Sequence, residues 1–229
     1  MSQWSSKIAI FGGTFDPPHL GHLEAARGLL QNPGVRQVWI TPTASPAYRG
    51  TLASAEHRLE MARLQFSNTK DIKIDEREIL RTLTQLTPNP SYTYDTLLEL
   101  KQEGVPAAFV LGTDQLEKLH TWHRFPELLG LADWIVLARK PQRPEAILNT
   151  LQLWKNQGLS LQTSNDREWS IQSPTGKASL IWVETPAAEI SSTSIREYIA
   201  RHGSPPENSL HPDVWSYLKK AGLYGTPHL

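Results

Sequence analysis

Two glycines and two histidines near the N-terminus have the types and spacing of a phosphate-binding site. Gly12 and Gly13 follow an apolar run, and His19 and His22 stand three positions apart before a stretch with helical spacing. Glycine lets backbone N–H groups approach a bulky anion, and the start of a helix favours negative charge. Imidazole donors there can stabilise charge that develops on phosphate oxygens. The segment therefore indicates handling of a triphosphate.

Each of these features has a simpler explanation when it stands alone. A His-x-x-His pair often serves as surface or helix-cap chemistry, or as half of a metal site. His19 and His22 share a helix face only if the helix has begun by His19. The stretch also lacks the P-loop pattern and the glycine spacing of the dinucleotide-binding fingerprint. Its meaning depends on the rest of the chain.

A second helix start carries the hydroxyls of Ser191, Ser192 and Thr193, with Arg196 one turn further along. Hydroxyls and the first N–H groups of a helix bind phosphate, and the guanidinium adds a planar, permanently charged fork. The alternative is an ordinary serine-rich N-cap. The segment is therefore a second candidate anion site.

Hydrophobic periodicity predicts the elements that must position these residues. Strands alternate with helices, which is typical of an α/β protein with a single Rossmann-like, doubly wound parallel sheet. Ligands of such sheets collect at the carboxyl ends of the strands. Residues 159–184 change to short alternating segments and predict a small appended hairpin, with C-terminal helices after it. Strands are expected at 8–11, 35–40, 72–75, 106–112 and 134–138, and helices at 23–30, 55–66, 92–103, 145–155, 194–202 and 214–221.

Local signals also predict how several helices begin. Ser54 and Ser91 are expected as N-caps, and Ser194 with Glu197 as a capping box. The charged, threonine-rich residues 76–89 are expected to be irregular.

Composition limits the class of protein. The 229 residues suit one domain, 1–229, and 39% hydrophobic content is enough for a core. The 23 basic and 23 acidic residues cancel, so no net charge attracts nucleic acid or lipid. Cysteine is absent, and no run approaches the ~18 apolar residues of a membrane span. A cytoplasmic protein without nucleic-acid or membrane partners is expected, and self-association into a homo-oligomer is left open.

Both candidate anion sites resemble one family. Residues 12–22 resemble the His-x-Gly-His signature of the nucleotidylyltransferase superfamily, most closely that of the bacterial nicotinate-nucleotide adenylyltransferases. Residues 190–196 resemble the Ile-Ser-Ser/Ala-Thr-x-Ile-Arg signature of the same family. The likeness runs from about residue 7 to residue 224 and includes a terminal Gly-Leu-Tyr at 222–224. Two ordered, widely separated signatures seldom agree by chance.

The resemblance implies a set of ATP-binding residues and names three of them, His19, His22 and Arg196, as catalytic. The ATP-binding set is Gly12, Gly13, Thr14, Phe15, His19, His22, Arg49, Ser191, Ser192, Thr193 and Arg196. Asp16 is a further candidate whose alternative role is turn chemistry. Mg²⁺ is expected to arrive with ATP, without a metal site built by the protein.

A second set is implied for the pyridine mononucleotide, with Trp122 stacked on the pyridine ring as in the family. The set is Thr14, Tyr92, Thr93, Asp114, Trp122, His123 and Arg139. Without the resemblance, Trp122 reads as core or interface, Asp114 as a helix cap and Arg139 as a surface ion pair.

Three features depart from the family pattern. Tyr48 stands where the family usually has a histidine, although Arg49 keeps the adjacent cation. The stretch 82–90 is longer than usual, and His123 replaces a commoner aromatic residue.

The resemblance implies adenylyl transfer from ATP to the 5′-phosphate of nicotinate mononucleotide, in NAD biosynthesis. A phosphate monoester is already largely ionised at neutral pH, so positioning and charge neutralisation remain as the protein's tasks. The alternatives are a transferase that takes nicotinamide mononucleotide, phosphopantetheine or a cytidylyl donor, a fragment related to class I aminoacyl-tRNA synthetases, and a non-catalytic nucleotide sensor.

Overall fold

A computed structural model describes residues 4–45, 52–84, 90–139, 144–185 and 190–226. Its sheet strands, as far as these residues show, run in the order β3-β2-β1-β4-β5-β8-β7-β6. The strands are β1 (Lys7–Gly13), β2 (Val35–Pro42), β3 (Ile72–Ile74), β4 (Ala107–Gly112), β5 (Asp133–Arg139), β6 (Ser160–Asn165), β7 (Glu168–Ser173) and β8 (Gly176–Thr185). The order β3-β2-β1-β4-β5 is that of a doubly wound Rossmann-like sheet. The predicted fold class is confirmed.

Helices join or follow these strands. They are α1 (Leu20–Leu30), α2 (Ala55–Gln65), α3 (Arg77–Thr84), α4 (Thr93–Gln102), α5 (Thr113–Lys118), α6 (Leu148–Asn156), α7 (Ser192–His202) and α8 (Pro212–Ala221). Short 3₁₀ turns are η1 (Leu119–Thr121), η2 (Glu127–Leu131), η3 (Pro144–Ile147) and η4 (Leu223–Gly225). Among the described residues, no helix has both the length and the apolar character needed to cross a membrane.

The chain divides into two compact units. The first comprises residues 1–11, 28–38 and 92–186, and the second comprises residues 12–27, 39–91 and 187–229. Strands β1 and β2 run from one unit into the other.

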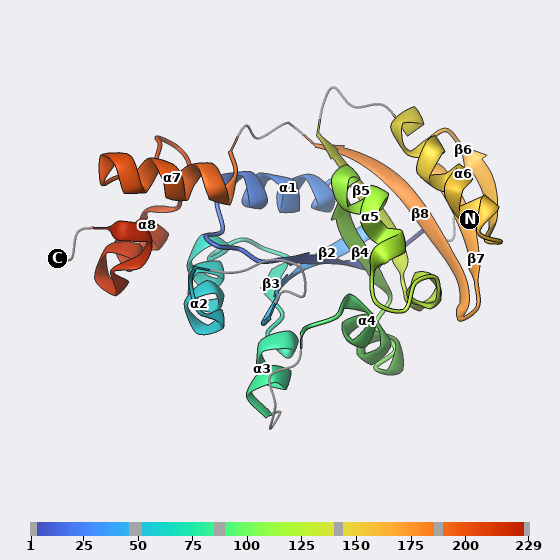
Figure 1. Ribbon diagram of the computed structural model, residues 1–229, viewed down its shortest axis with the longest axis horizontal. Coiled ribbons are helices and arrows are strands. Elements are labelled where there is room, and N and C mark those ends of the chain that lie inside the picture. The colour runs from blue at the N-terminus through green and yellow to red at the C-terminus, as the bar shows by residue number, and fades with distance from the viewer. Residues whose placement is uncertain (1–3, 46–51, 85–89, 140–143, 186–189, 227–229) are drawn as a thin grey trace. The chain divides into compact units, whose positions relative to one another are not determined.

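The first unit is built on parallel strands. β4 pairs in parallel with β1 and with β5, and β5 pairs in parallel with β8 (Figure 1). The segment expected as a hairpin forms β6, β7 and β8, which pair antiparallel with one another. Local alternation predicts such a hairpin, but it does not reveal that β8 also joins the main sheet beside β5.

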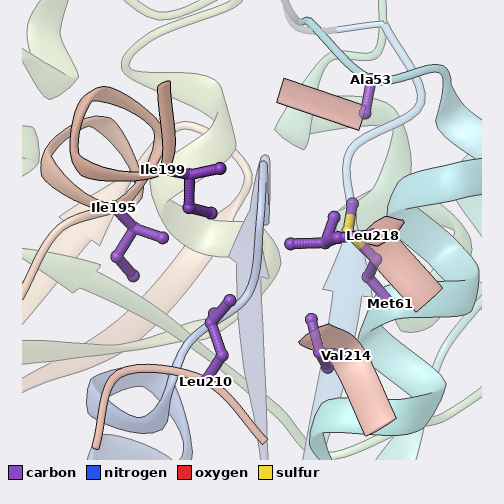
Figure 2. Packing of buried hydrophobic residues seen from close by; sticks show 7 residues of the cluster. All are labelled: Ala53, Met61, Ile195, Ile199, Leu210, Val214 and Leu218. Carbon is purple, nitrogen blue, oxygen red and sulfur yellow. The ribbon is translucent and has the colours of Figure 1, made fainter. Parts of the chain in front are cut away.

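The second unit has a core between α2, α7 and α8. Seven buried side chains form it, and Figure 2 shows Met61 of α2 with Ile195 and Ile199 of α7 and with Val214 and Leu218 of α8. Each of the Met, Ile, Val and Leu side chains among them contributes roughly 2 kcal/mol of hydrophobic stabilisation when it is removed from water. This packing fixes the start of α7, which carries the second candidate anion site.

Three local predictions in the second unit are wrong. Residues 77–84 form α3 instead of an irregular segment, because Ile79 is buried against Ala44 and Leu59. Ser91 does not cap α4, since its hydroxyl accepts a hydrogen bond from the Ser45 N–H at 3.4 Å. The predicted N-cap of α7 is wrong as well, because Ser191 and not Ser194 is the capping residue.

Candidate active site

The turn between β1 and α1 is organised around a buried phenylalanine. Phe15 has a left-handed backbone (φ 51°) and a ring that is only 2% exposed. A Cβ on Gly13 would lie 2.9 Å from Cζ of this ring. Only glycine permits that approach. The missing Cβ of Gly13 therefore leaves room for the Phe15 ring. This packing role is independent of any phosphate binding.

The two histidines lie against each other. α1 begins at Leu20, one residue after His19, and the rings of His19 and His22 stack with centroids 3.7 Å apart. Phe15 meets the His22 ring edge-on at 5.0 Å. The His19 backbone N–H donates to Nδ1 of His22 at 3.2 Å. A neutral imidazole that accepts at Nδ1 carries its proton on Nε2. The fold thus selects the form of His22 in which Nε2 is a donor.

The two signatures are in contact. They are residues 12–22 and 191–196, here called the paired signatures. The Ser192 hydroxyl donates to the Pro17 carbonyl at 2.8 Å. Nη1 of Arg196 donates to the Asp16 carbonyl at 2.6 Å, and Nη2 donates to the Thr193 hydroxyl at 3.3 Å. Residues that the sequence places far apart therefore lie side by side within the second unit.

The start of α7 differs from its prediction. Ser191 is the N-cap, and it forms a capping box with Ser194, whose N–H donates to the Ser191 hydroxyl at 3.1 Å. The expected pair of Ser194 with Glu197 is wrong, because the helix starts at Ser192 instead of Ser194. The Ser191 hydroxyl thus serves the helix end.

Asp16 connects three segments of the second unit. Its carboxylate is 5% exposed and accepts the Leu52 N–H at 2.9 Å and the Ala53 N–H at 3.2 Å. The Tyr224 hydroxyl donates to Oδ1 of the same carboxylate. Burial, followed by this hydrogen bond to Asp16, raises the pKa of Tyr224 above its ordinary value, so its hydroxyl stays a donor. Asp16 thus has long-range partners instead of the local turn chemistry considered from the sequence.

Arg58 on α2 is fully buried and was missed by the sequence interpretation. Its guanidinium makes four hydrogen bonds to carbonyls, two of them from Nη1 to Thr14 at 2.8 Å and to Thr43 at 2.6 Å. The other two acceptors are the carbonyls of Ala44 and Ala53. Burial lowers the pKa of Arg58, and the nearby Asp16 charge opposes this effect. The side chain ties the turn of the first signature to two loops.

One signal in the sequence could have revealed Arg58. The buried face of α2 includes Arg58, Met61, Ala62 and Gln65, which follow the i, i+3, i+4, i+7 spacing of a core-facing stripe. A charged residue in such a stripe needs partners for its donors in the interior. The pattern predicts a buried cation but not the carbonyls that it binds.

Several residues expected to bind the mononucleotide form an aromatic group (Tyr92, Tyr94, Phe109, Trp122 and His123) in the first unit. His123 is exposed and stacks on Tyr92 with centroids 4.2 Å apart, and it meets Tyr94 edge-on at 6.2 Å. Trp122 is half-buried and lies edge-on to Phe109 at 6.1 Å. The structure thus brings Tyr92 and His123 together and supports Trp122 from β4.

The remaining predicted residues lie on other elements or outside the described residues. Asp114 is exposed in the first turn of α5, and a Cβ on Gly112 would lie 2.7 Å from its Oδ1. Thr93 is the first residue of α4. Arg139 ends β5, and its side chain lies outside what the structure describes. Tyr48 and Arg49 lie outside the described residues, as do residues 85–89 of the long stretch at 82–90.

A metal could also have been expected near the histidines. Within the described residues, no group of three or more His, Cys, Asp or Glu side chains is arranged to hold a metal ion.

The chain is similar to proteins of one class of nucleotidyltransferases. A family model described as cytidylyltransferase-like matches residues 10–198. A probable nicotinate-nucleotide adenylyltransferase of Hahella chejuensis is 39% identical, over 97% of this chain and 98% of its own length. One from Pectobacterium atrosepticum is 36% identical, over 96% and 99%. The chain therefore belongs to the nicotinate-nucleotide adenylyltransferase family of cytidylyltransferase-like proteins.

Solved structures share the fold. Nicotinic acid mononucleotide adenylyltransferase of Plasmodium falciparum, complexed with APC, superposes with a TM-score of 0.66 at 20% identity, over 96% of this chain and 97% of the other. The same enzyme complexed with NaAD gives a TM-score of 0.66 at 19% identity. At this identity the likeness concerns the fold alone.

Proposed function

We propose that this protein is a nucleotidyltransferase that transfers the adenylyl group of ATP to the 5′-phosphate of nicotinate mononucleotide. The products are nicotinate adenine dinucleotide and pyrophosphate, and the reaction belongs to NAD biosynthesis in the cytoplasm, where ATP is supplied. The near full-length relatives at 39% and 36% identity carry the name of this activity. The contact of Arg196 with the Asp16 carbonyl is the observation that carries the proposal, because it joins the two segments proposed to bind phosphate.

The chemistry follows from the substrates. An oxygen of the mononucleotide 5′-phosphate attacks the α-phosphorus of ATP in line. A new P–O bond forms, and the bond from the α-phosphorus to the bridging oxygen breaks, with its electron pair leaving on pyrophosphate. The attacking phosphate is already largely ionised at neutral pH, so the protein need not remove a proton. ATP enters as its Mg²⁺ complex, and the metal is part of that substrate.

The paired signatures supply donors for this reaction. His22 and the stacked His19 are proposed to neutralise charge on the α- and β-phosphates, with the Nε2–H of His22 as the donor that its hydrogen bond selects. Backbone N–H groups of residues 12–15 and the groups of Ser192, Thr193 and Arg196 would hold the remaining phosphate oxygens. No side chain is required as a covalent nucleophile.

The aromatic group is the proposed pyridine site. The Trp122 indole contacts Phe109, and His123, the next residue in the chain, stacks on Tyr92. Indole faces stack well on electron-poor rings. Thr93, Asp114 and Arg139 would complete this site, and the preference for the acid over the amide is inferred from the names of the relatives.

A product assay tests the proposal. The protein is incubated with ATP, Mg²⁺ and either nicotinate or nicotinamide mononucleotide, and the products are separated by chromatography. We expect one pyrophosphate per dinucleotide formed, and faster turnover with the acid. Absence of dinucleotide with both substrates would overturn the proposed activity, and faster turnover with the amide would overturn the proposed preference.

A further inference from the structure

Tyr224 has a backbone conformation that L side chains rarely adopt. It lies at φ 57°, ψ 28° in η4, between Gly222 and Gly225. Non-glycine residues persist in this region where the surrounding structure holds them, and such positions often serve a function. Some interaction of Tyr224 therefore has to account for its conformation.

The Tyr224 side chain contacts the first of the paired signatures, and this contact can account for its backbone conformation. Its hydroxyl donates to Oδ1 of Asp16, and the backbone carbonyl of Asp16 accepts Nη1 of Arg196. Asp16 stands three residues before His19 in the same turn. The hydroxyl is thus two interactions away from the proposed donors to the triphosphate.

The other bonds of Asp16 make its position sensitive to Tyr224. Oδ1 accepts both the Tyr224 hydroxyl and the Ala53 N–H, while Oδ2 accepts the Leu52 N–H. Loss of one donor leaves a buried carboxylate with fewer partners, and such a group moves toward other donors or toward water. Movement of Asp16 would carry the turn with it.

An acid–base role for Tyr224 is inconsistent with its surroundings. Burial and the hydrogen bond to Asp16 keep its pKa well above the working range, and the charges of Arg196 and Arg58 only partly oppose this. Its hydroxyl remains a neutral donor, so its influence on a reaction is geometric.

We infer that Tyr224 is a positioning residue for adenylyl transfer: its hydrogen bond to Asp16 fixes the turn that presents His19 and His22, so the C-terminal segment sets the turnover rate. This inference rests on the proposed function. It assigns a role in that reaction to a residue that lies outside the paired signatures.

The first test is Tyr224→Phe, which removes the hydroxyl and keeps the ring. Small misplacements of reacting groups lower rates strongly, so we expect kcat to fall about tenfold or more. The KM for nicotinate mononucleotide should change much less than kcat, because the aromatic group belongs to the other unit and only Thr14 of the mononucleotide set lies in this turn. An unchanged kcat, or a kcat lowered only in proportion to the folded fraction, would overturn the inference.

A matched control is available nearby. Tyr217 of α8 also has a bonded hydroxyl, 2.8 Å from Nδ1 of His57, and it lies outside the paired signatures. Tyr217→Phe therefore removes the same group from the same end of the chain. We expect it to lower thermal stability while kcat remains that of the wild type. Equal loss of kcat in both variants would mean that the tyrosines act through stability alone.

A double-mutant cycle tests whether Tyr224 acts through Asp16. Asp16→Asn keeps the side-chain size and one oxygen but removes the charge. By itself it should lower kcat much more than it changes the mononucleotide KM. Adding Tyr224→Phe to Asp16→Asn should cost much less than it does in the wild type, because coupled residues are not additive. Full additivity would overturn the inference.

The outcomes separate the two proposals. A wild-type protein that forms no dinucleotide refutes the proposed function. A wild type that forms it, beside a Tyr224→Phe variant of equal kcat, refutes only the role of Tyr224. If Tyr224→Phe does not fold, a folded Asp16→Asn variant with full kcat refutes the role equally.

Discussion

The paired signatures and the aromatic group are held by different kinds of contact. Around the first signature, buried Arg58 and Asp16 make hydrogen bonds to backbone groups of three separate segments, at residue 14, at 43–44 and at 52–53. In the aromatic group, rings contact rings, and His123 is exposed. Hydrogen bonds are strongly directional, whereas ring contacts accept a range of angles and distances.

This difference agrees with the two tasks of the proposed reaction. Charge development at phosphorus requires donors at defined positions, and errors of about 1 Å there are costly. Binding a flat ring requires area more than exact position. We therefore expect substitutions near the paired signatures to affect stability and kcat, and substitutions in the aromatic group to affect the KM for the mononucleotide.

The largest effect is expected for Arg58→Met. The substitution keeps an unbranched chain but removes all four hydrogen bonds and leaves buried carbonyls without these donors. The free energy of unfolding should fall by about 4 kcal/mol, as for losing several charged-donor bonds. Urea denaturation monitored by tryptophan fluorescence would measure it.

The next turn of α2 provides a control for this prediction. Arg63 is exposed and pairs with Glu60 and Glu76. Arg63→Met should cost about 1 kcal/mol or less, as is usual for exposed ion pairs. Similar losses in the two variants would remove the distinction between a buried tie and a surface charge.

His22→Ala is expected to lower kcat by ~10²-fold or more, which is typical of losing one donor to a developing negative charge. The KM for ATP should change modestly, since other groups still hold the triphosphate. Steady-state kinetics with both substrates would measure this. His120→Ala is the control, because His120 is exposed and bonds only a carbonyl of its own turn in the described contacts. Wild-type turnover in His22→Ala would remove the central role of the paired signatures.

Trp122→Ala is expected to raise the KM for nicotinate mononucleotide about tenfold, in line with losing one aromatic stack. Its kcat at saturating substrate should fall much less than in His22→Ala. Trp215→Ala, which removes a partly buried indole of α8 beside Lys219, should leave this KM unchanged. A titration in which Trp122→Ala binds the mononucleotide as the wild type does would contradict the pyridine site.

The smallest effect is expected for Ser54→Ala. Ser54 caps α2, the helix that carries Arg58, and removing such a cap costs about 1 kcal/mol. The Ser54 hydroxyl also lowers the pKa of Glu56, so that contribution to stability is present above the ordinary pKa of glutamate and disappears as the pH falls through the lowered value. The cost should therefore be smaller in acid than at neutral pH. Thermal melts across this range would show it, and a cost that increases in acid would contradict it.

Much of the fold follows from the sequence because its strands are continuous apolar runs. The run at 106–112 predicts a buried strand, and β4 lies centrally between β1 and β5. Pairing of β8 with β5 was not predictable, because it is a long-range pairing that local alternation does not encode. The helix at 77–84 does not follow from the sequence, because its threonines favour irregular structure. Burial of Ile79, which packs this helix onto the protein, depends on residues far away in the chain.

Candidate site residues can be predicted from the sequence where they belong to a local motif, whereas contacts between distant residues cannot. Residues 12–22 and 191–196 were identified from their own patterns, and the structure adds that they touch. Arg58 donates to the carbonyl of Thr14, and Tyr224 donates to the carboxylate of Asp16, each of which is far away in the chain. No pattern of residue types specifies such partners, so only the folded chain reveals them.

The threading of the second unit has a consequence for how the protein is made. This unit is assembled from residues 12–27, 39–91 and 187–229, and Asp16 receives its hydroxyl donor from Tyr224. During synthesis the first signature leaves the ribosome long before that tyrosine is translated. Until Tyr224 has emerged, the nascent chain therefore carries this turn without the hydroxyl donor that Asp16 accepts in the folded protein.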